Sequence, residues 1–176
     1  MSAAYKAGVA VGIFVGIIVF VILFKIVNKD KSYKTRYDEK QEAVRGRGYK
    51  YGFFTMLFYS FILIFLAAFD IAIPMTQEVV QFTGIVLGGL VMASYDIWND
   101  AYMGLNTSAK GFAVFSVVVS IINFLSAFSA IFEGRMYKDG ILQLSFANLL
   151  CGILFIFIGA ELLLKSLKDK KEEEED

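Results

Sequence analysis

The chain has 176 residues, of which 57% are apolar and 19% charged, and its 17 basic residues equal its 17 acidic residues in number. A mean hydropathy of +0.62 excludes an ordinary soluble domain and indicates a membrane protein. Because there is no histidine and one cysteine, Cys151, the usual His-based catalytic and metal sites and an internal disulfide are excluded. We therefore expect no catalytic residue, no metal or other cofactor, and no nucleic-acid partner.

Five windows of about 20 residues are almost free of charge, which is the length that a helix needs to cross a hydrocarbon core of about 30 Å. Each window must be helical, because lipid offers no partner for an unpaired backbone group. The windows are 8–27, 53–73, 79–98, 112–132 and 143–164. The sequence therefore predicts an all-α fold, a polytopic integral membrane bundle of five transmembrane helices.

The first window has the features of a retained anchor. No A-x-A cleavage site follows it, and a run of lysines does. The charged C-terminal run is typical of a solvated, disordered tail. We therefore predict four regions along the chain: an N-terminal transmembrane anchor helix (1–27), a basic cytoplasmic connector (28–52), a four-helix transmembrane region of two hairpins (53–165) and a disordered charged tail (166–176).

The basic residues are distributed unevenly between the two sides of the predicted bundle. If residues 28–52 are cytoplasmic, 14 of the 17 Lys and Arg residues fall on the cytoplasmic side, and only Lys6, Arg135 and Lys138 fall on the other. The positive-inside rule then favours an N-terminus outside and a C-terminus in the cytoplasm. We expect a multi-pass protein of the cell membrane in this orientation.

Glycines recur at every fourth position in two of the predicted spans. The first span has Gly8, Gly12 and Gly16, and the third has Gly84 and Gly88. Small residues at this spacing let another helix backbone approach closely. The pattern favours packing against helices of the same chain, and the alternative is a seam for a second copy or for another membrane protein.

Polar side chains form a stripe on the fourth predicted span. Ser116, Ser120 and Asn123 fall within one arc of about 100° on a helix. Asn148 on the fifth span is a candidate hydrogen-bond partner for Asn123 or Ser126, because it lies at a similar depth. The stripe favours hydrogen bonds between helices, and the alternative is a hydrated pore or a ligand site.

Ionisable residues lie near the ends of the predicted spans and not at their centres. Glu161 comes one turn before Lys165, and we expect the two to pair. An ion-coupled carrier usually needs a carboxylate at mid-depth, so this placement argues against that class of protein.

A charged stretch, YDEKQEAVRGRGYKYGFF (37–54), leads into the second predicted span. Its acidic residues come first and its basic residues last, which suits a short helix. Three glycines, Gly46, Gly48 and Gly52, are expected to loosen that helix before the span begins. The neighbouring Tyr and Phe residues predict an aromatic belt at the membrane interface.

Arg45 and Arg47 of this stretch are expected to lie on the same membrane surface as Asp96 and Asp100 at the end of the third span. The arginines therefore have two candidate partners, these aspartates or the phosphates of the lipid. Pairing with the aspartates would join the second and third spans or form a surface for a partner.

Two stretches of the chain, YDEKQEAVRGRGYKYGFFT and IWNDAYMGLN, resemble the paired motifs of an uncharacterised family of small multi-pass membrane proteins from Gram-positive bacteria. In that family the first stretch tends to begin Y-D-E-R-Q, and this chain has Lys40 where the arginine is expected. The resemblance covers about 30 residues and implies a topology and a type of host, but no activity.

We interpret the chain as a non-enzymatic membrane protein that acts by association with itself or with another membrane protein, as an accessory, regulatory or immunity-like factor. The alternative is a small transporter or channel lined by the Ser/Asn stripe. A membrane-embedded enzyme is disfavoured because no HExxH, nucleophile elbow or phosphate-binding loop is present.

Overall fold

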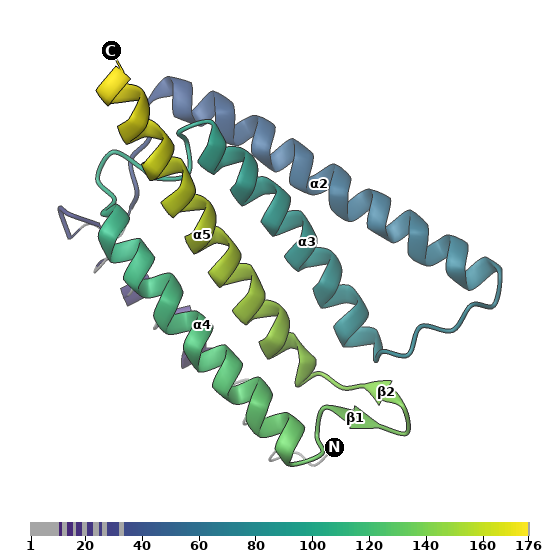
Figure 1. Cartoon of the computed structure of the whole chain (residues 1–176). Helices are drawn as coiled ribbons and strands as arrows, with labels where there is room; N and C mark the ends of the chain where they lie inside the picture. The colour runs from purple at the N-terminus through teal and green to yellow at the C-terminus, as the bar shows by residue number, and fades with distance from the viewer. Residues whose placement is uncertain are drawn as a thin grey trace.

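The computed structural model describes residues 11, 14, 15, 17, 18, 21, 22, 25, 28–31 and 34–175. The described part contains helices α2 (Glu39–Ala68), α3 (Gln77–Trp98), α4 (Ala109–Phe132) and α5 (Phe146–Glu175), with a small hairpin of β1 (Tyr137–Lys138) and β2 (Ile141–Leu142) before α5 (Figure 1). Most of the first predicted span, including Gly8, Gly12 and Gly16, lies outside the described residues. A fifth span therefore stays a prediction.

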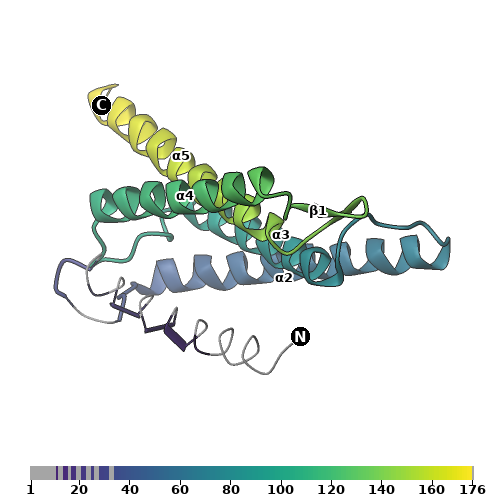
Figure 2. The ribbon, with the colours of Figure 1, turned by 90° about the horizontal axis from the view of Figure 1, so that it is seen from below.

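The four helices lie side by side in the spatial order α2, α3, α5, α4, because α2 packs on α3, α3 on α5 and α5 on α4 (Figure 1). Figure 2 shows the C-terminal part of α5 leaving this layer. Each helix is long and apolar enough to cross a membrane, and large apolar side chains cover their outer faces. The predicted all-helical membrane architecture is confirmed to this extent.

Helix α2 begins earlier than predicted. Asp38 and Gln41 form a capping box, in which the Asp38 carboxylate accepts from the Gln41 backbone N–H at 2.7 Å. The helix then continues through Gly46, Gly48 and Gly52, so the expectation that these glycines loosen it is wrong. It ends at Ala68, before the predicted limit, where the chain turns. Half of the predicted connector is thus a helix continuous with the second span.

Helix α5 runs on to Glu175, where we expected a disordered tail from residue 166. The reason lies in the spacing of its charges, since acid and base alternate one helical turn apart. Such i,i+4 pairs support a helix even where no tertiary contact does. The pairs are Lys165–Asp169, Lys168–Glu172 and Lys171–Glu175.

The two ends of the bundle differ in character. One end, which we call the opposite end, consists of residues 69–76 and 133–145. Its β1–β2 hairpin turns through Asp139 and Gly140, which both have left-handed backbone conformations. The charged end, at the other side of the bundle, consists of residues 28–31, 34–49 and 94–108 with the part of α5 from residue 161 on. The hairpin was not predicted, because its turn lies in a connector too short to show strand periodicity.

Candidate functional site at the charged end of the bundle

Two segments that are far apart in the sequence meet at the charged end. The Gln41 side-chain amide donates to the backbone carbonyl oxygens of Asp100 at 2.9 Å and Met103 at 3.0 Å. The Leu105 N–H donates to the carbonyl of Arg36 at 2.8 Å. These contacts join residues 36–41 to residues 100–105, so two segments about 60 residues apart form one surface.

Asn106 is the hub of this junction. It is buried, its side-chain oxygen accepts from the Arg36 N–H at 2.9 Å, and its amide donates to the Lys34 carbonyl at 3.0 Å and to the Asp30 carboxylate at 3.0 and 3.2 Å. Its own backbone carbonyl accepts from Lys29 N at 2.6 Å. Asn106 thus joins loop 99–107 to four described residues before α2, which are Lys29, Asp30, Lys34 and Arg36. Asn106 was not predicted as a site residue, because nothing local in the sequence distinguishes it from an ordinary turn asparagine.

Asp96 and Arg45 form the buried ionic contact of the site. The Asp96 side chain is 1% exposed, and its Oδ2 lies 3.7 Å from Arg45 Nη1. Its other oxygen, Oδ1, has no hydrogen-bond partner among the described residues and lies against Gly48, where a Cβ atom would overlap it. Gly48 therefore leaves room for the carboxylate, because any larger side chain at this position would overlap it.

The Arg45 guanidinium has further partners that hold it in place. Nη2 donates to the Tyr49 hydroxyl at 2.9 Å, and Nη1 donates to the Ala101 carbonyl at 3.3 Å. The guanidinium carbon lies 4.1 Å from the centre of the Tyr37 ring, which is a cation–π distance. Arg45 thus connects α2, the end of α3 and the segment before α2.

The other residues predicted for this surface are placed differently. Asp100 pairs with Lys165 at 3.0 Å and not with an arginine. Arg47 is exposed and makes no ion pair in the part of the chain that the structure describes. Lys165 is shared between Asp100 and Asp169, so the expected partner Glu161 is left to other donors.

Glu161 instead links α5 to α3. Its carboxylate accepts from the Ser94 hydroxyl at 2.8 Å and from the Trp98 indole N–H at 3.3 Å. The apolar contact of Ala93, Ile97 and Ile158 lies beside this polar one. At the charged end, α5 is therefore joined to α3 by polar and apolar side chains near the helix ends.

Burial also changes the acidity of two tyrosines at this end. Desolvation is the main cause that raises the pKa of Tyr37 above its ordinary value, with Arg45 opposing it. Desolvation raises the pKa of Tyr102 strongly, and the nearby Tyr37 raises it further. Both phenols therefore keep their protons at neutral pH and can act as hydrogen-bond donors.

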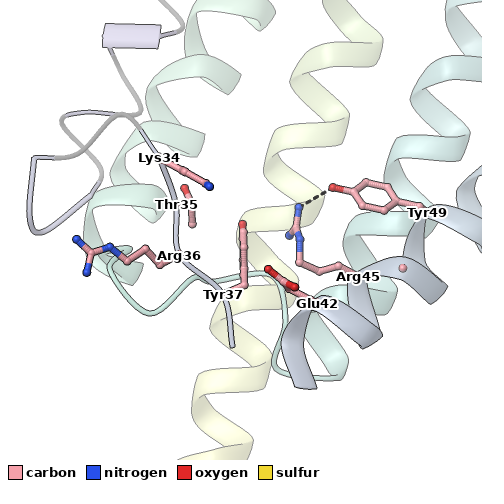
Figure 3. Close-up of a pocket in the computed structure, with 8 residues that line it drawn as sticks. Lys34, Thr35, Arg36, Tyr37, Glu42, Arg45 and Tyr49 are labelled. Carbon is pink, nitrogen blue, oxygen red and sulfur yellow. Dashed lines mark hydrogen bonds between the residues drawn. The ribbon is translucent and has the colours of Figure 1, made fainter. Parts of the chain in front are cut away.

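A pocket of about 730 Å³ opens between α2 and the segment before it (Figure 3). Ligand pockets in proteins typically have volumes of about 300–1,000 Å³. The walls of this one are Lys34, Thr35, Arg36, Tyr37, Glu42, Arg45, Gly46 and Tyr49. In Figure 3 the side chains of Lys34, Tyr37 and Tyr49 are directed into the space beside Arg45, and that of Arg36 is directed away from it.

The glycines of the third span lie in the contact between α2 and α3. A Cβ atom at Gly84 would come 2.7 Å from the Tyr59 ring, and one at Gly88 would come 2.5 Å from the Met56 side chain. Gly52, on α2, faces the Gly88 carbonyl in the same way. Gly52, expected to loosen the helix, instead lets α2 and α3 approach closely because it is small.

The polar stripe of α4 faces α5. Ser116 and Ser120 are buried, and Ser120 donates to the Gly152 carbonyl at 3.3 Å. Asn123 donates to the Val119 carbonyl of its own helix at 2.8 Å and not, through this bond, to Asn148, which is half-buried on α5. A cavity of about 220 Å³ lies in this contact, lined mainly by apolar side chains together with Ser116 and Ser120.

Among the described residues, no group of three or more acidic, cysteine or histidine side chains is arranged to hold a metal ion. Comparison of the chain with protein-family models, with characterised proteins and with solved structures finds no match.

Proposed function

We propose that the chain is a multi-pass protein of the cell membrane that acts by associating with other membrane proteins, as an accessory, regulatory or immunity-like factor, and not by catalysis. The non-catalytic part of the proposal rests on the sequence, which has no histidine and one half-buried cysteine. The family resemblance favours the plasma membrane of a Gram-positive bacterium.

A ridge of phenylalanines on α2 is the observation that carries the association proposal. Among the described elements α2 packs chiefly on α3, which leaves the far side of α2 uncovered. Four exposed aromatic residues follow one another there at spacings of four, three and four residues, which places them on one helical face. The ridge consists of Phe54, Phe58, Phe61 and Phe65. Large side chains in such a register suit the groove of a second helix.

Site-specific photo-crosslinking tests this proposal. A photoreactive amino acid at Phe58, whose side chain is 68% exposed, should crosslink to a protein of defined mass in intact membranes. The matched control is Leu125 on α4, which is 65% exposed and outside the ridge. Equal protein crosslinking at both positions, or only lipid adducts at both, would contradict the proposal.

We further propose five spans with the N-terminus outside and the C-terminus in the cytoplasm. This orientation is supported by the 14 of 17 basic residues on one side, and it makes the charged end cytoplasmic. A reporter that is active only outside the cell, fused after Asp176, should be inactive. Activity of that reporter would reverse the orientation.

A small transporter or channel is the second candidate function, and one observation favours it. The Ser116 hydroxyl is buried beside the cavity between α4 and α5 and has no hydrogen-bond partner among the described residues. If water fills this cavity, a Ser116→Cys variant lacking Cys151 should react with a hydrophilic thiol reagent in intact membranes. Failure to react, with reaction of the same variant in denaturant, would exclude a hydrated path at this position.

A further inference from the structure

The pocket at the charged end collects hydrogen-bond donors from two segments. The Lys34 ammonium and the Arg45 guanidinium face it, and the Tyr37 and Tyr49 hydroxyls are directed into the same space (Figure 3). Glu42 is the one carboxylate among the lining residues. The balance of chemistry in the pocket therefore favours an anion with several acceptor oxygens.

Two of these donors, Arg45 and Tyr49, have hydrogen-bonding capacity for a ligand beyond their bonds to each other and to Ala101. A guanidinium has five N–H groups, and those of Arg45 make two hydrogen bonds, to the Tyr49 hydroxyl and the Ala101 carbonyl, beside the ion pair with Asp96, so that further N–H groups can meet an anion. Because the Tyr49 hydroxyl accepts from Arg45, its own proton points elsewhere and can be donated. An arginine held between two tyrosines is also fixed in orientation, which lowers the entropy lost when an anion binds.

An apolar path leads from the pocket along α2. Tyr49 on the pocket wall is followed at one-turn intervals by Phe53 and Leu57, which lie on the same face of the helix and are exposed. The pocket is thus placed where the aromatic belt of α2 marks the edge of the apolar span. A molecule with a phosphate at one end and a hydrocarbon chain at the other matches a polar pocket that is followed by this apolar surface.

We propose that this pocket binds the phosphate-bearing headgroup of an anionic phospholipid, with Lys34 and Arg45 on the phosphate and an acyl chain along Phe53 and Leu57. The site is independent of the association function, because it lies on a different face of α2 from the phenylalanine ridge. The proposal also gives a ligand to the stretch 37–54, which contributes five of the residues that line the pocket.

The experiment measures lipid binding to the purified full-length protein in a neutral detergent, by native mass spectrometry. The probes are short-chain phosphatidylglycerol, phosphatidylcholine with the same chains, and inorganic phosphate. We expect phosphatidylglycerol to bind in preference to phosphatidylcholine, and inorganic phosphate to compete only at much higher concentration. Equal binding of the two lipids would overturn the proposal, and competition by inorganic phosphate at the lipid's own concentration would reassign the site to a soluble phosphate.

Three variants separate the pocket from the general charge of this end. Lys34→Gln should weaken phosphatidylglycerol binding about five-fold, which is the usual contribution of one basic residue near anionic lipid. Glu42→Gln should strengthen it by a similar factor, a gain that a folding defect does not produce. Arg36→Gln is the matched control, because it removes the same charge two residues from Lys34 with a side chain directed to Asp30. Wild-type affinity in Lys34→Gln, or an equal loss in Arg36→Gln, would overturn the proposal.

Discussion

At the charged end of the bundle, the side chains of Gln41 and Asn106 bond to groups between 59 and 76 residues away in the sequence. At the opposite end, Arg135 and Gln143 bond to groups only two residues away, and they do so in solvent. The two ends differ in what their polar side chains join, because at the opposite end distant segments are joined by backbone groups, as in the bond from Leu142 N–H to the Pro74 carbonyl at 2.9 Å. Where polar side chains are buried and join distant segments, removing one disturbs several elements, whereas a local exposed bond can be lost with little effect.

The largest expected effect comes from the buried ionic contact of the charged end. Arg45→Gln leaves the Asp96 carboxylate, which is 1% exposed, without its counter-ion, and this should lower the free energy of unfolding by about 3 kcal/mol. Asp96→Asn should cost clearly less, because Arg45 keeps Tyr37, Tyr49 and some solvent exposure. The double variant should therefore be more stable than Arg45→Gln alone. Thermal unfolding in detergent measures all three.

The exposed pair Glu133–Arg135, with 2.6 Å between Arg135 Nε and Glu133 Oε2, is the control for that cycle. Its single and double Gln variants should be additive, because solvent screens the charges. Coupling at Glu133–Arg135 as strong as that at Asp96–Arg45 would show that burial does not distinguish the two ends.

The second effect concerns the close approach of α2 and α3 at Gly52 and Gly88, beyond the charged end. In Gly52→Ala the new Cβ would lie 2.8 Å from the Gly88 backbone carbonyl, which cannot move without moving α3. We expect a loss of about 1–3 kcal/mol in stability, the usual cost of overpacking. Gly46→Ala is the matched control, since its Cβ meets nothing within 4 Å and alanine favours a helix by up to about 1 kcal/mol. Unchanged thermal stability of Gly52→Ala would contradict this account.

The sequence was sufficient to predict α3 and α4 within three residues at each end, because their charge-free windows coincide with the helices. It was not sufficient for α2, because the first four turns of this helix are charged and contain glycines. Two of these glycines are needed for close contact with Asp96 and Gly88 on α3, which the sequence does not show. Intrinsic propensity predicted a break where packing required small residues in a continuous helix.

The sequence predicted which residues of the candidate site lie near one another, but not which of them pair. Helix ends on one surface bring Arg45 near both Asp96 and Asp100, but the choice between them depends on the register of α2 against α3. That register is set by the glycine contacts, which a single sequence does not specify. Asn106 was missed for a related reason, since its partners lie about 70 residues away in the chain.

A third and smaller effect distinguishes two glutamines. Gln41→Ala removes the bonds to the Asp100 and Met103 carbonyls and should cost about 1–2 kcal/mol in stability. Gln143→Ala removes a single bond to the Ile141 carbonyl at the opposite end and should change stability by less than about 0.5 kcal/mol. Amide hydrogen exchange should also rise across loop 99–107 in Gln41→Ala only. Equal exchange in both variants would mean that Gln41 does not hold the loop.

The smallest effect is a difference in pH response between the two ends. The pKa of Tyr102 is raised above its ordinary value of 10.0 by burial, so the folded state holds this proton more tightly than the unfolded state does. Its contribution to stability is complete below pH 10.0 and is lost as pH rises from there toward the folded pKa. The pKa of Glu133 is lowered from 4.5, first by the hydrogen bond from Arg135, so its contribution is complete above pH 4.5 and is lost as pH falls through the folded pKa.

Thermal unfolding as a function of pH tests both signs of this comparison. Tyr102→Phe should make the decline in stability above pH 10.0 less steep and leave the acid limb unchanged. Arg135→Gln should raise the pKa of Glu133 toward 4.5, weaken the acid limb and leave the alkaline limb unchanged. Because Glu133 is exposed to solvent, its limb should be the weaker of the two. If each variant altered both limbs equally, the two ends would titrate as one electrostatic unit, and the contrast between a buried end and an exposed end would fail.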